Sequence, residues 1–95
     1  MIVNVDVRPE HREALPAITH VDGSARVQTV SAAGNPEFHK LVQAVGRRTG
    51  REMVLNTSFN VKGQAIVNTP EEALDTLLGC GAQALFLENT LVLKR

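Results

Sequence analysis

The sequence predicts an α/β fold, with a mixed twisted sheet and about two helices packed on it. Two segments place apolar residues at helical spacing between clear start and stop signals. Several short runs either alternate apolar with polar residues or are rich in β-branched residues, as strands are. The 95 residues suffice for one domain. We therefore predict a single domain over residues 1–95, with the element order β-β-α-β-β-α-β-β.

The first predicted strand is Ile2–Val7, where apolar and polar residues alternate as in a strand with one buried face. A turn or short helix follows in Glu10–Ala14. The second strand, Ala25–Val30, has Arg26 and Gln28 on one face. This polar stripe is either the solvated side of an antiparallel sheet or a ligand-facing surface with a guanidinium for a phosphate.

The two helices are predicted from their terminal residues. Asn35-Pro36 is typical of a helix start, and Gly50 can serve as the C-cap. Thr69-Pro70 starts the second helix in the same way, and Gly79 or Gly81 ends it. The first helix is expected to be amphipathic and the second to have a buried stripe; the apolar residues at helical spacing are Phe38, Leu41, Val42 and Val45 in the first and Ala73, Leu74, Leu77 and Leu78 in the second.

The remaining predicted strands lie in the second half of the chain. Arg51–Asn56 follows the first helix, and Ala65–Val67 is a short extended run before the second helix. Ala84–Leu87 and Leu91–Leu93 are predicted to pair as a hairpin, with Glu88-Asn89-Thr90 as the tight connection.

A polar loop, Leu55–Gly63 (LNTSFNVKG), separates the third and fourth of these strands. Short amide and hydroxyl side chains favour loops because they compete with regular backbone hydrogen bonding. The loop is either a simple turn, which composition alone favours, or a site for a phosphate or small polar ligand. Its candidate ligand-binding residues are Asn56, Thr57, Ser58, Asn60 and Lys62.

Composition excludes several classes of function. Ten basic and ten acidic residues give a formal net charge of zero, which argues against nonspecific binding to nucleic acid. The three histidines are scattered without a ligand spacing, and no Walker or GxGxxG motif or paired CxxC is present, so we predict no metal site. No apolar run approaches the ~18 residues of a membrane span. The single cysteine, Cys80, cannot form an internal disulfide, so we expect a protein of the reducing cytoplasm. It lies in an apolar stretch and is expected to be a buried structural thiol.

Three stretches carry a resemblance to a known family: Pro16–Val30 (PAITHVDGSARVQTV), Asn35–Gly50 (NPEFHKLVQAVGRRTG) and Val54–Pro70 (VLNTSFNVKGQAIVNTP). They resemble the C-terminal region of carbamoyltransferases of the nodulation and antibiotic-tailoring type. The resemblance covers nearly the whole chain in the same order. Gln64 and Asn68 depart from it, at positions where glutamate and cysteine are expected.

The resemblance implies an activity and a fold. Such enzymes transfer a carbamoyl group from carbamoyl phosphate to a hydroxyl group, using ATP as a substrate. Their C-terminal part is similar to the YrdC-like fold, which makes a carbamoyl-adenylate, and the transfer step belongs to an N-terminal part with a histidine-held iron. A YrdC-like domain has about twice this length, so the chain would be a partial one. It would need the N-terminal domain or a separate subunit as its partner.

Site residues follow from the same resemblance. The Ser-x-Asn signature of the YrdC-like fold matches Ser58 and Asn60, and Arg26 would neutralise charge on the adenylate phosphate. We assign Ser58, Asn60 and Arg26 to catalysis. The further residues assigned to substrate or nucleotide binding are Asn56, Thr57, Lys62, His20 and Gln28. His20 and Asp22 are either polar site residues or a structural hydrogen-bonded pair.

Three functions remain open from the sequence. The chain is part of an O-carbamoyltransferase that contributes to carbamoyl-adenylate formation, a nucleotide or carbamoyl phosphate binding or docking module without turnover, or an inactive relic. The intact Arg26 and Ser58-x-Asn60 motifs disfavour the relic. An unprotected sheet edge would also favour pairing with a second copy, so a homodimer is possible.

Overall fold

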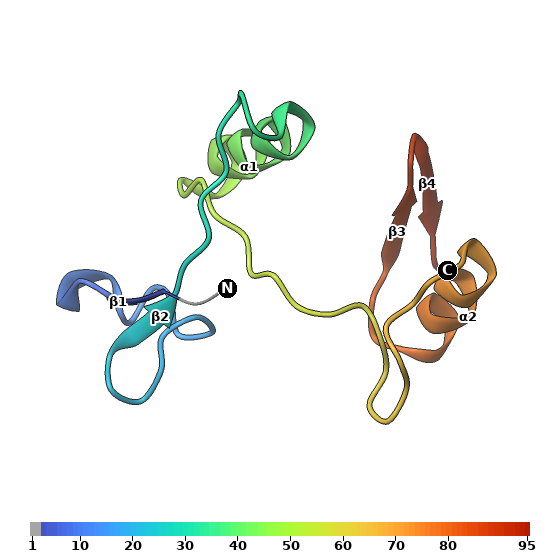
Figure 1. Cartoon of the computed structure of the whole chain (residues 1–95), viewed down its shortest axis with the longest axis horizontal. Helices are drawn as coiled ribbons and strands as arrows, with labels where there is room; N and C mark the ends of the chain where they lie inside the picture. Colours follow the sequence, from blue (N-terminus) through green and yellow to red (C-terminus); the bar gives the residue numbers. More distant parts are fainter. Residues whose placement is uncertain (1–2) are drawn as a thin grey trace. The chain divides into compact units, whose positions relative to one another are not determined.

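The structure, a computed structural model, describes residues 3–95 and contains two helices, a 3₁₀ turn and four strands over that range (Figure 1). The elements in chain order are β1 (Asn4–Asp6), η1 (Pro9–His11), β2 (Ser24–Arg26), α1 (Pro36–Thr49), α2 (Pro70–Gly79), β3 (Ala84–Leu87) and β4 (Thr90–Leu93). The predicted α/β class with two helices is confirmed. The chain forms two compact units that divide after Asn56, and a single domain over residues 1–95 stays a prediction.

In the first unit, β1 and β2 pair in antiparallel register, with Val5 opposite Ala25. The turn before β2 requires Gly23, which is buried and has a φ of 84°. A Cβ there would lie 2.6 Å from Cζ of Arg12, whose Nε donates to the Val7 carbonyl at 2.9 Å. The small core of this unit therefore forms where the two strands and this turn meet, and Val7 and Ala25 are its buried apolar residues.

Helix α1 begins and ends where its capping residues predict. The Asn35 side chain accepts a hydrogen bond from the Phe38 backbone N–H at 3.2 Å. Gly50 adopts the left-handed conformation, with a φ of 83°, and its N–H donates to the Gly46 carbonyl at 2.8 Å. No residue of α1 is buried, and the apolar positions of this helix are half-buried or exposed.

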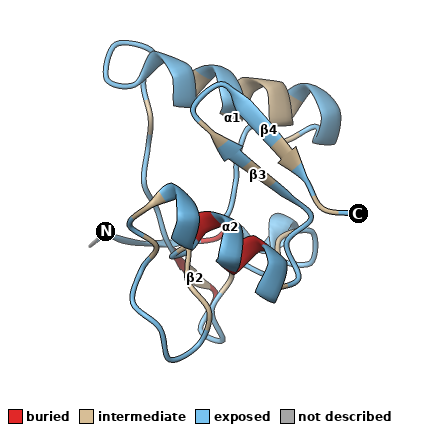
Figure 2. Cartoon of the chain, turned by 90° about the vertical axis from the view of Figure 1, so that its right-hand side faces the viewer, coloured by how far each residue is buried: buried red, intermediate tan, exposed pale blue. Residues whose placement is uncertain are grey.

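In the second unit, the predicted start of α2 is confirmed, because the Thr69 hydroxyl accepts from the Glu72 backbone N–H at 3.1 Å. Ala73 and Leu77 of the predicted stripe are buried, whereas Leu74 and Leu78 are exposed. Figure 2 shows the buried positions on α2. Helix α2 contacts β3.

Strands β3 and β4 form the predicted hairpin, with Phe86 opposite Leu91. The two strands are joined by a two-residue turn in which Glu88 has a φ of 53°, a conformation that L-residues with a Cβ rarely adopt. Beyond β4, the Lys94 backbone N–H donates to the Gln83 carbonyl at 2.9 Å and extends the contact between the two ends of the hairpin.

The arrangement of the strands differs from the predicted mixed sheet. The described strands form two separate antiparallel pairs, and β2 ends at Arg26 rather than at Val30. Arg51–Asn56 and Ala65–Val67 are not strands. A strand requires a hydrogen-bonded neighbour, and neither segment has a ladder partner among residues 3–95. Ile2, at the start of the first predicted strand, lies outside the described residues.

Neither α1 nor α2, the two α-helices of the described chain, has the length and apolar content of a membrane span.

Candidate functional site

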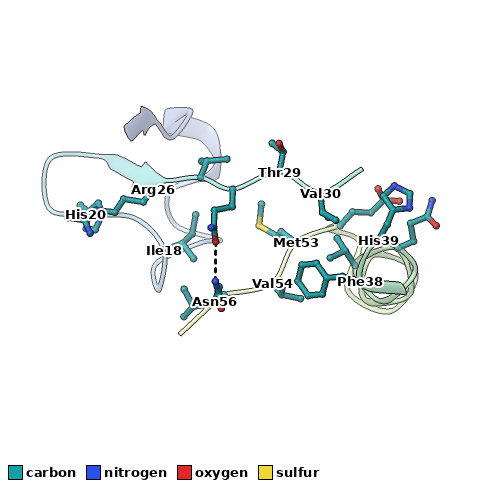
Figure 3. A pocket seen from close by; sticks show the side chains of 16 residues that line it. Ile18, His20, Arg26, Thr29, Val30, Phe38, His39, Met53, Val54 and Asn56 are labelled. Atoms are coloured by element: carbon teal, nitrogen blue, oxygen red, sulfur yellow. Dashed lines mark hydrogen bonds between the residues drawn. The ribbon is translucent and has the colours of Figure 1, made fainter. Parts of the chain in front are cut away.

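A groove of about 700 Å³ in the first unit collects several of the predicted site residues. Its walls come from the chain segments 26–30 and 52–56, from the first two turns of α1, and from residues before β2. Figure 3 shows His20 and Arg26 at one end of the view and Phe38 at the other. The groove therefore combines a polar part with an apolar part that includes Phe38, Met53 and Val54.

Arg26 reaches this groove because it is the last residue of β2. Successive side chains of a strand point to opposite faces, and Ala25, its neighbour, is only 3% exposed. The Arg26 side chain is accordingly exposed and lines the groove, together with Gln28. The prediction that Arg26 and Gln28 lie on one face is consistent with this geometry, and that the face binds a ligand stays a prediction.

Gln28 and Asn56 meet across the groove. The Asn56 Nδ2 donates to the Gln28 Oε1 at 3.0 Å, and both side chains are exposed (Figure 3). This bond joins two chain segments that belong to no ladder among residues 3–95. It is the contact that brings Asn56, the first polar residue of the Leu55–Gly63 loop, to the same groove as Arg26.

His20 also lines the groove, but Asp22 does not. The Asp22 Oδ1 accepts hydrogen bonds from the Ser24 Oγ at 2.6 Å and from the Ser24 backbone N–H at 2.9 Å. These two bonds, the hydroxyl one first, lower the pKa of Asp22 below its ordinary value of 3.8, and nearby His20 adds a smaller effect. Asp22 therefore has Ser24 as its hydrogen-bonding partner, and the predicted hydrogen bond between His20 and Asp22 is not formed.

The backbone of this turn is equally well bonded. The His20 N–H donates to the Ser24 carbonyl at 2.7 Å, and the Gly23 N–H donates to the His20 carbonyl at 2.9 Å. The Val7 N–H then donates to the Gly23 carbonyl at 2.8 Å. These bonds fix the point at which β2 begins, and hence which of its side chains reach the groove.

The second unit contains the rest of the polar loop. The Asn60 Nδ2 donates to the Gln64 carbonyl at 2.9 Å and to the Val61 carbonyl at 3.4 Å. The Val67 N–H donates to the Phe59 carbonyl at 2.9 Å and closes the loop around Gly63, which has a φ of 87°. The amide donors of Asn60 thus shape the loop. Its Oδ1 makes no hydrogen bond within the described chain.

The eight predicted site residues divide equally between the two units. The first unit brings His20, Arg26, Gln28 and Asn56 to one groove. The second unit holds Thr57, Ser58, Asn60 and Lys62, of which all but Asn60 are exposed. That both groups bind one ligand stays a prediction.

Sequence reasoning missed the apolar part of the groove. Phe38 and Val42 had the spacing of a core-facing helical stripe, and Met53 and Val54 had the composition of a strand. In the structure all four line the groove instead. The only signal available was their position directly beside polar candidates, which does not distinguish a groove wall from a core.

Two further predictions concern cysteine and metal. Cys80 is half-buried rather than buried, and its Sγ accepts from the Ala82 backbone N–H at 3.4 Å, so the thiol contributes to the turn after α2. Within residues 3–95, no three His, Cys, Asp or Glu side chains come together as a metal-binding group. The absence of a metal from the function of this domain stays a prediction.

Residues 1–94 match the protein family described as Carbamoyltransferase C-terminus. The chain belongs to this family. It is 37% identical over 95 residues to an uncharacterised protein of Methanocaldococcus jannaschii. The aligned region covers 100% of the chain and 16% of that relative. It is 41% identical over 91 residues to the nodulation protein NolNO of Sinorhizobium fredii, covering 96% of the chain and 13% of the relative.

A named enzyme is among the relatives of this carbamoyltransferase domain. The chain is 40% identical over 78 residues to the 3'-hydroxymethylcephem-O-carbamoyltransferase of Amycolatopsis lactamdurans, covering 82% of the chain and 14% of that enzyme. The resemblance inferred from the three sequence stretches is thus confirmed at the level of the family. The domain spans between 13% and 16% of the length of these three relatives.

Proposed function

We propose that this chain is the C-terminal part of an ATP-dependent O-carbamoyltransferase and contributes to carbamoyl-adenylate formation from carbamoyl phosphate and ATP. The observation that carries the proposal is the groove of the first unit, where His20, Arg26, Gln28 and Asn56 come together. Membership of the carbamoyltransferase C-terminus family supports the reaction class.

Arg26 is the residue we assign to the phosphate. A guanidinium offers a planar set of donors that fits phosphate oxygens, and it keeps its charge at any physiological pH. His20 lies in the same groove and adds a ring nitrogen that can donate to a phosphate oxygen. Placed beside a phosphoryl group, the Arg26 charge stabilises the negative charge that builds up during adenylate formation.

The apolar part of the groove suits the nucleotide base. Phe38 is 39% exposed, so part of its ring remains open in the groove. A flat heterocycle can stack on such a ring while Met53 and Val54 contact its edges. ATP is therefore proposed as the substrate of this site, with its base toward Phe38 and its phosphates toward Arg26.

We also propose Ser58 and Asn60, in the loop of the second unit, as residues that contribute to catalysis, with Thr57 and Lys62 as additional binding residues. The support is chemical. The Ser58 hydroxyl and the Asn60 Oδ1 are a donor and an acceptor that a polar substrate can use, and Lys62 adds an exposed cation. Lys62 supplies charge without the bidentate geometry of an arginine.

The binding step is tested by titrating the ¹⁵N-labelled chain with ATP and with carbamoyl phosphate and following its amide shifts by NMR. Shifts are expected at residues 26–28 and 56–62. The Arg26→Ala variant should lose ~1.5–3 kcal/mol of phosphate binding, the scale of a hydrogen bond to a charged group, whereas Arg48→Ala, an exposed arginine outside the groove, should lose none. Equal affinities of the two variants would remove Arg26 from the site.

The second candidate is a binding or docking module without turnover. It is favoured by the small share of the relatives that the chain covers, 13% to 16%. We propose that an N-terminal domain or a separate subunit supplies the transfer step, and that the chain can also pair with a second copy. Pyrophosphate release that depends on both ATP and carbamoyl phosphate distinguishes adenylate formation from binding alone.

A further inference from the structure

We propose that Gln28 and Asn56 recognise the carbamoyl group itself, which inserts into the hydrogen bond that their side chains make with each other. This inference rests on the proposed function, because it assigns a specificity to the same groove. It predicts that the site distinguishes carbamoyl phosphate from acyl phosphates of the same size.

The starting observation is the bond between the two amides. The Asn56 Nδ2 donates to the Gln28 Oε1 at 3.0 Å across the groove, between residues 28 positions apart in the sequence. Neither Gln28 nor Asn56 lies in a helix or strand, and both side chains are exposed. The two side chains are therefore free to turn about their own torsions without disturbing a ladder.

A carbamoyl group has the same hydrogen-bonding atoms as these side chains. It carries one carbonyl oxygen and one NH₂ group, as does the amide of asparagine or glutamine. Inserted between the two residues, its oxygen accepts from the Asn56 Nδ2 and its NH₂ donates to the Gln28 Oε1. The direction of the existing bond is preserved, with one hydrogen bond replaced by two.

Opening the hydrogen bond between Gln28 and Asn56 to admit a carbamoyl group costs little free energy. An exposed hydrogen bond between neutral groups contributes little net free energy, because water replaces either partner when the bond opens. The hydrogen bond in the unliganded groove thus holds the two amides near each other. A ligand with matching hydrogen-bonding groups can replace it easily. A ligand that matches only one of the two amides leaves the other to water.

Arg26 and Gln28 are two positions apart, and both line the groove. Carbamoyl phosphate carries its phosphate on the carbon that also bears the carbonyl oxygen and the NH₂ group. A ligand with its phosphate at Arg26 therefore has its carbamoyl group within the same groove as the amide pair. In this proposal Arg26 binds the phosphate of carbamoyl phosphate, and the amides of Gln28 and Asn56 bind its adjacent carbamoyl group.

The test compares three ligands on the intact chain: inorganic phosphate, acetyl phosphate and carbamoyl phosphate. Acetyl phosphate has the carbonyl oxygen and a methyl group in place of the NH₂ group. Carbamoyl phosphate is expected to bind about fivefold more tightly than acetyl phosphate, the ratio given by one neutral hydrogen bond. The dissociation constants are measured by NMR titration at fixed pH and ionic strength.

Two variants separate the roles of the amides. Gln28→Leu removes the acceptor for the NH₂ group, so it should abolish the fivefold preference and leave acetyl phosphate binding unchanged. Asn56→Leu removes the donor to the carbonyl oxygen, so it should weaken carbamoyl phosphate and acetyl phosphate alike and preserve their ratio. Gln43→Leu is the matched control, because Gln43 lines the same groove from α1 and should change neither ligand.

The outcomes distinguish this inference from the proposed function. Binding of phosphate that depends on Arg26 but shows no preference for the carbamoyl ligand would overturn the amide recognition and leave the proposed function intact. A preference that survives Gln28→Leu would also overturn it. If none of the three ligands binds at Arg26, the proposed function itself fails.

Discussion

Lys94 stabilises the C-terminal end of α2, and its removal provides a quantitative test of the second unit. The Lys94 Nζ donates to the Leu77 carbonyl at 2.9 Å and also to the Cys80 carbonyl. The last turn of α2 has no basic residue of its own, and its C-cap, Cys80, is extended rather than left-handed. Lys94 therefore satisfies carbonyls that the helix leaves without partners and places a cation at the negative end of the helix dipole.

The expected cost of Lys94→Met follows from these contacts. A hydrogen bond to a charged group contributes about 1.5–3 kcal/mol when it is well shielded. Lys94 is half-buried, so solvent competes for its ammonium group and the two bonds together are expected to contribute about 1.5–3 kcal/mol. The same change at Lys62, an exposed lysine of the same unit, should cost less than about 0.5 kcal/mol.

Native-state amide hydrogen exchange measures this difference locally. Protection of the α2 amides in Lys94→Met should fall about tenfold to a hundredfold, because ~1.4 kcal/mol corresponds to a factor of ten. Amides of α1 should be unaffected. If Lys94→Met loses no more α2 protection than Lys62→Met, the capping role of Lys94 is refuted.

Three other predictions concern turns. Gly23→Ala should destabilise the first unit by about 2 kcal/mol in urea unfolding, because a φ of 84° is strained for any residue with a Cβ. Gly79→Ala is the control and should cause no loss of stability, because a Cβ at Gly79 would meet open space. Because hydrogen bonds from Ser24 lower the pKa of Asp22, its contribution to stability is full above pH 3.8 and lost as the pH falls through the lowered pKa. This loss, followed by the exchange of the Ser24 amide, should be absent in Asp22→Asn. Glu88→Gly should stabilise the hairpin by about 0.5–1 kcal/mol in thermal unfolding by relieving a φ of 53°, and Glu88→Ala should give no such gain.

The helices could be predicted from the sequence because their signals are local. The Asn35 cap, the left-handed Gly50 and the Thr69 cap each depend on residues within one turn of the helix end. The hairpin of β3 and β4 was predictable for the same reason, since a two-residue connection brings its strands together directly.

The extended segments were harder to predict because a strand depends on a neighbour that the local sequence does not specify. Residues 51–56 have the composition of a strand but no ladder partner among the described residues, and their side chains line a groove instead. The hydrogen bond between Gln28 and Asn56 could not be predicted either, since no local sequence signal relates two amides 28 positions apart. Sequence reasoning identified both residues as candidates without relating them to each other.

Among the polar residues of the sequence stretches that resemble the family, some form the turn before β2 and others line the groove. The register of β2 links these two roles. Asp22, Gly23 and Ser24 form the turn that places Ala25 opposite Val5. A slip of one residue would exchange the two faces of the strand, so that Arg26 would occupy the buried position of Ala25 and leave the groove. A variant of this turn that still folds should therefore weaken phosphate binding through Arg26 without touching the ligand. Asp22 would then influence the groove only through the register that brings Arg26 to it.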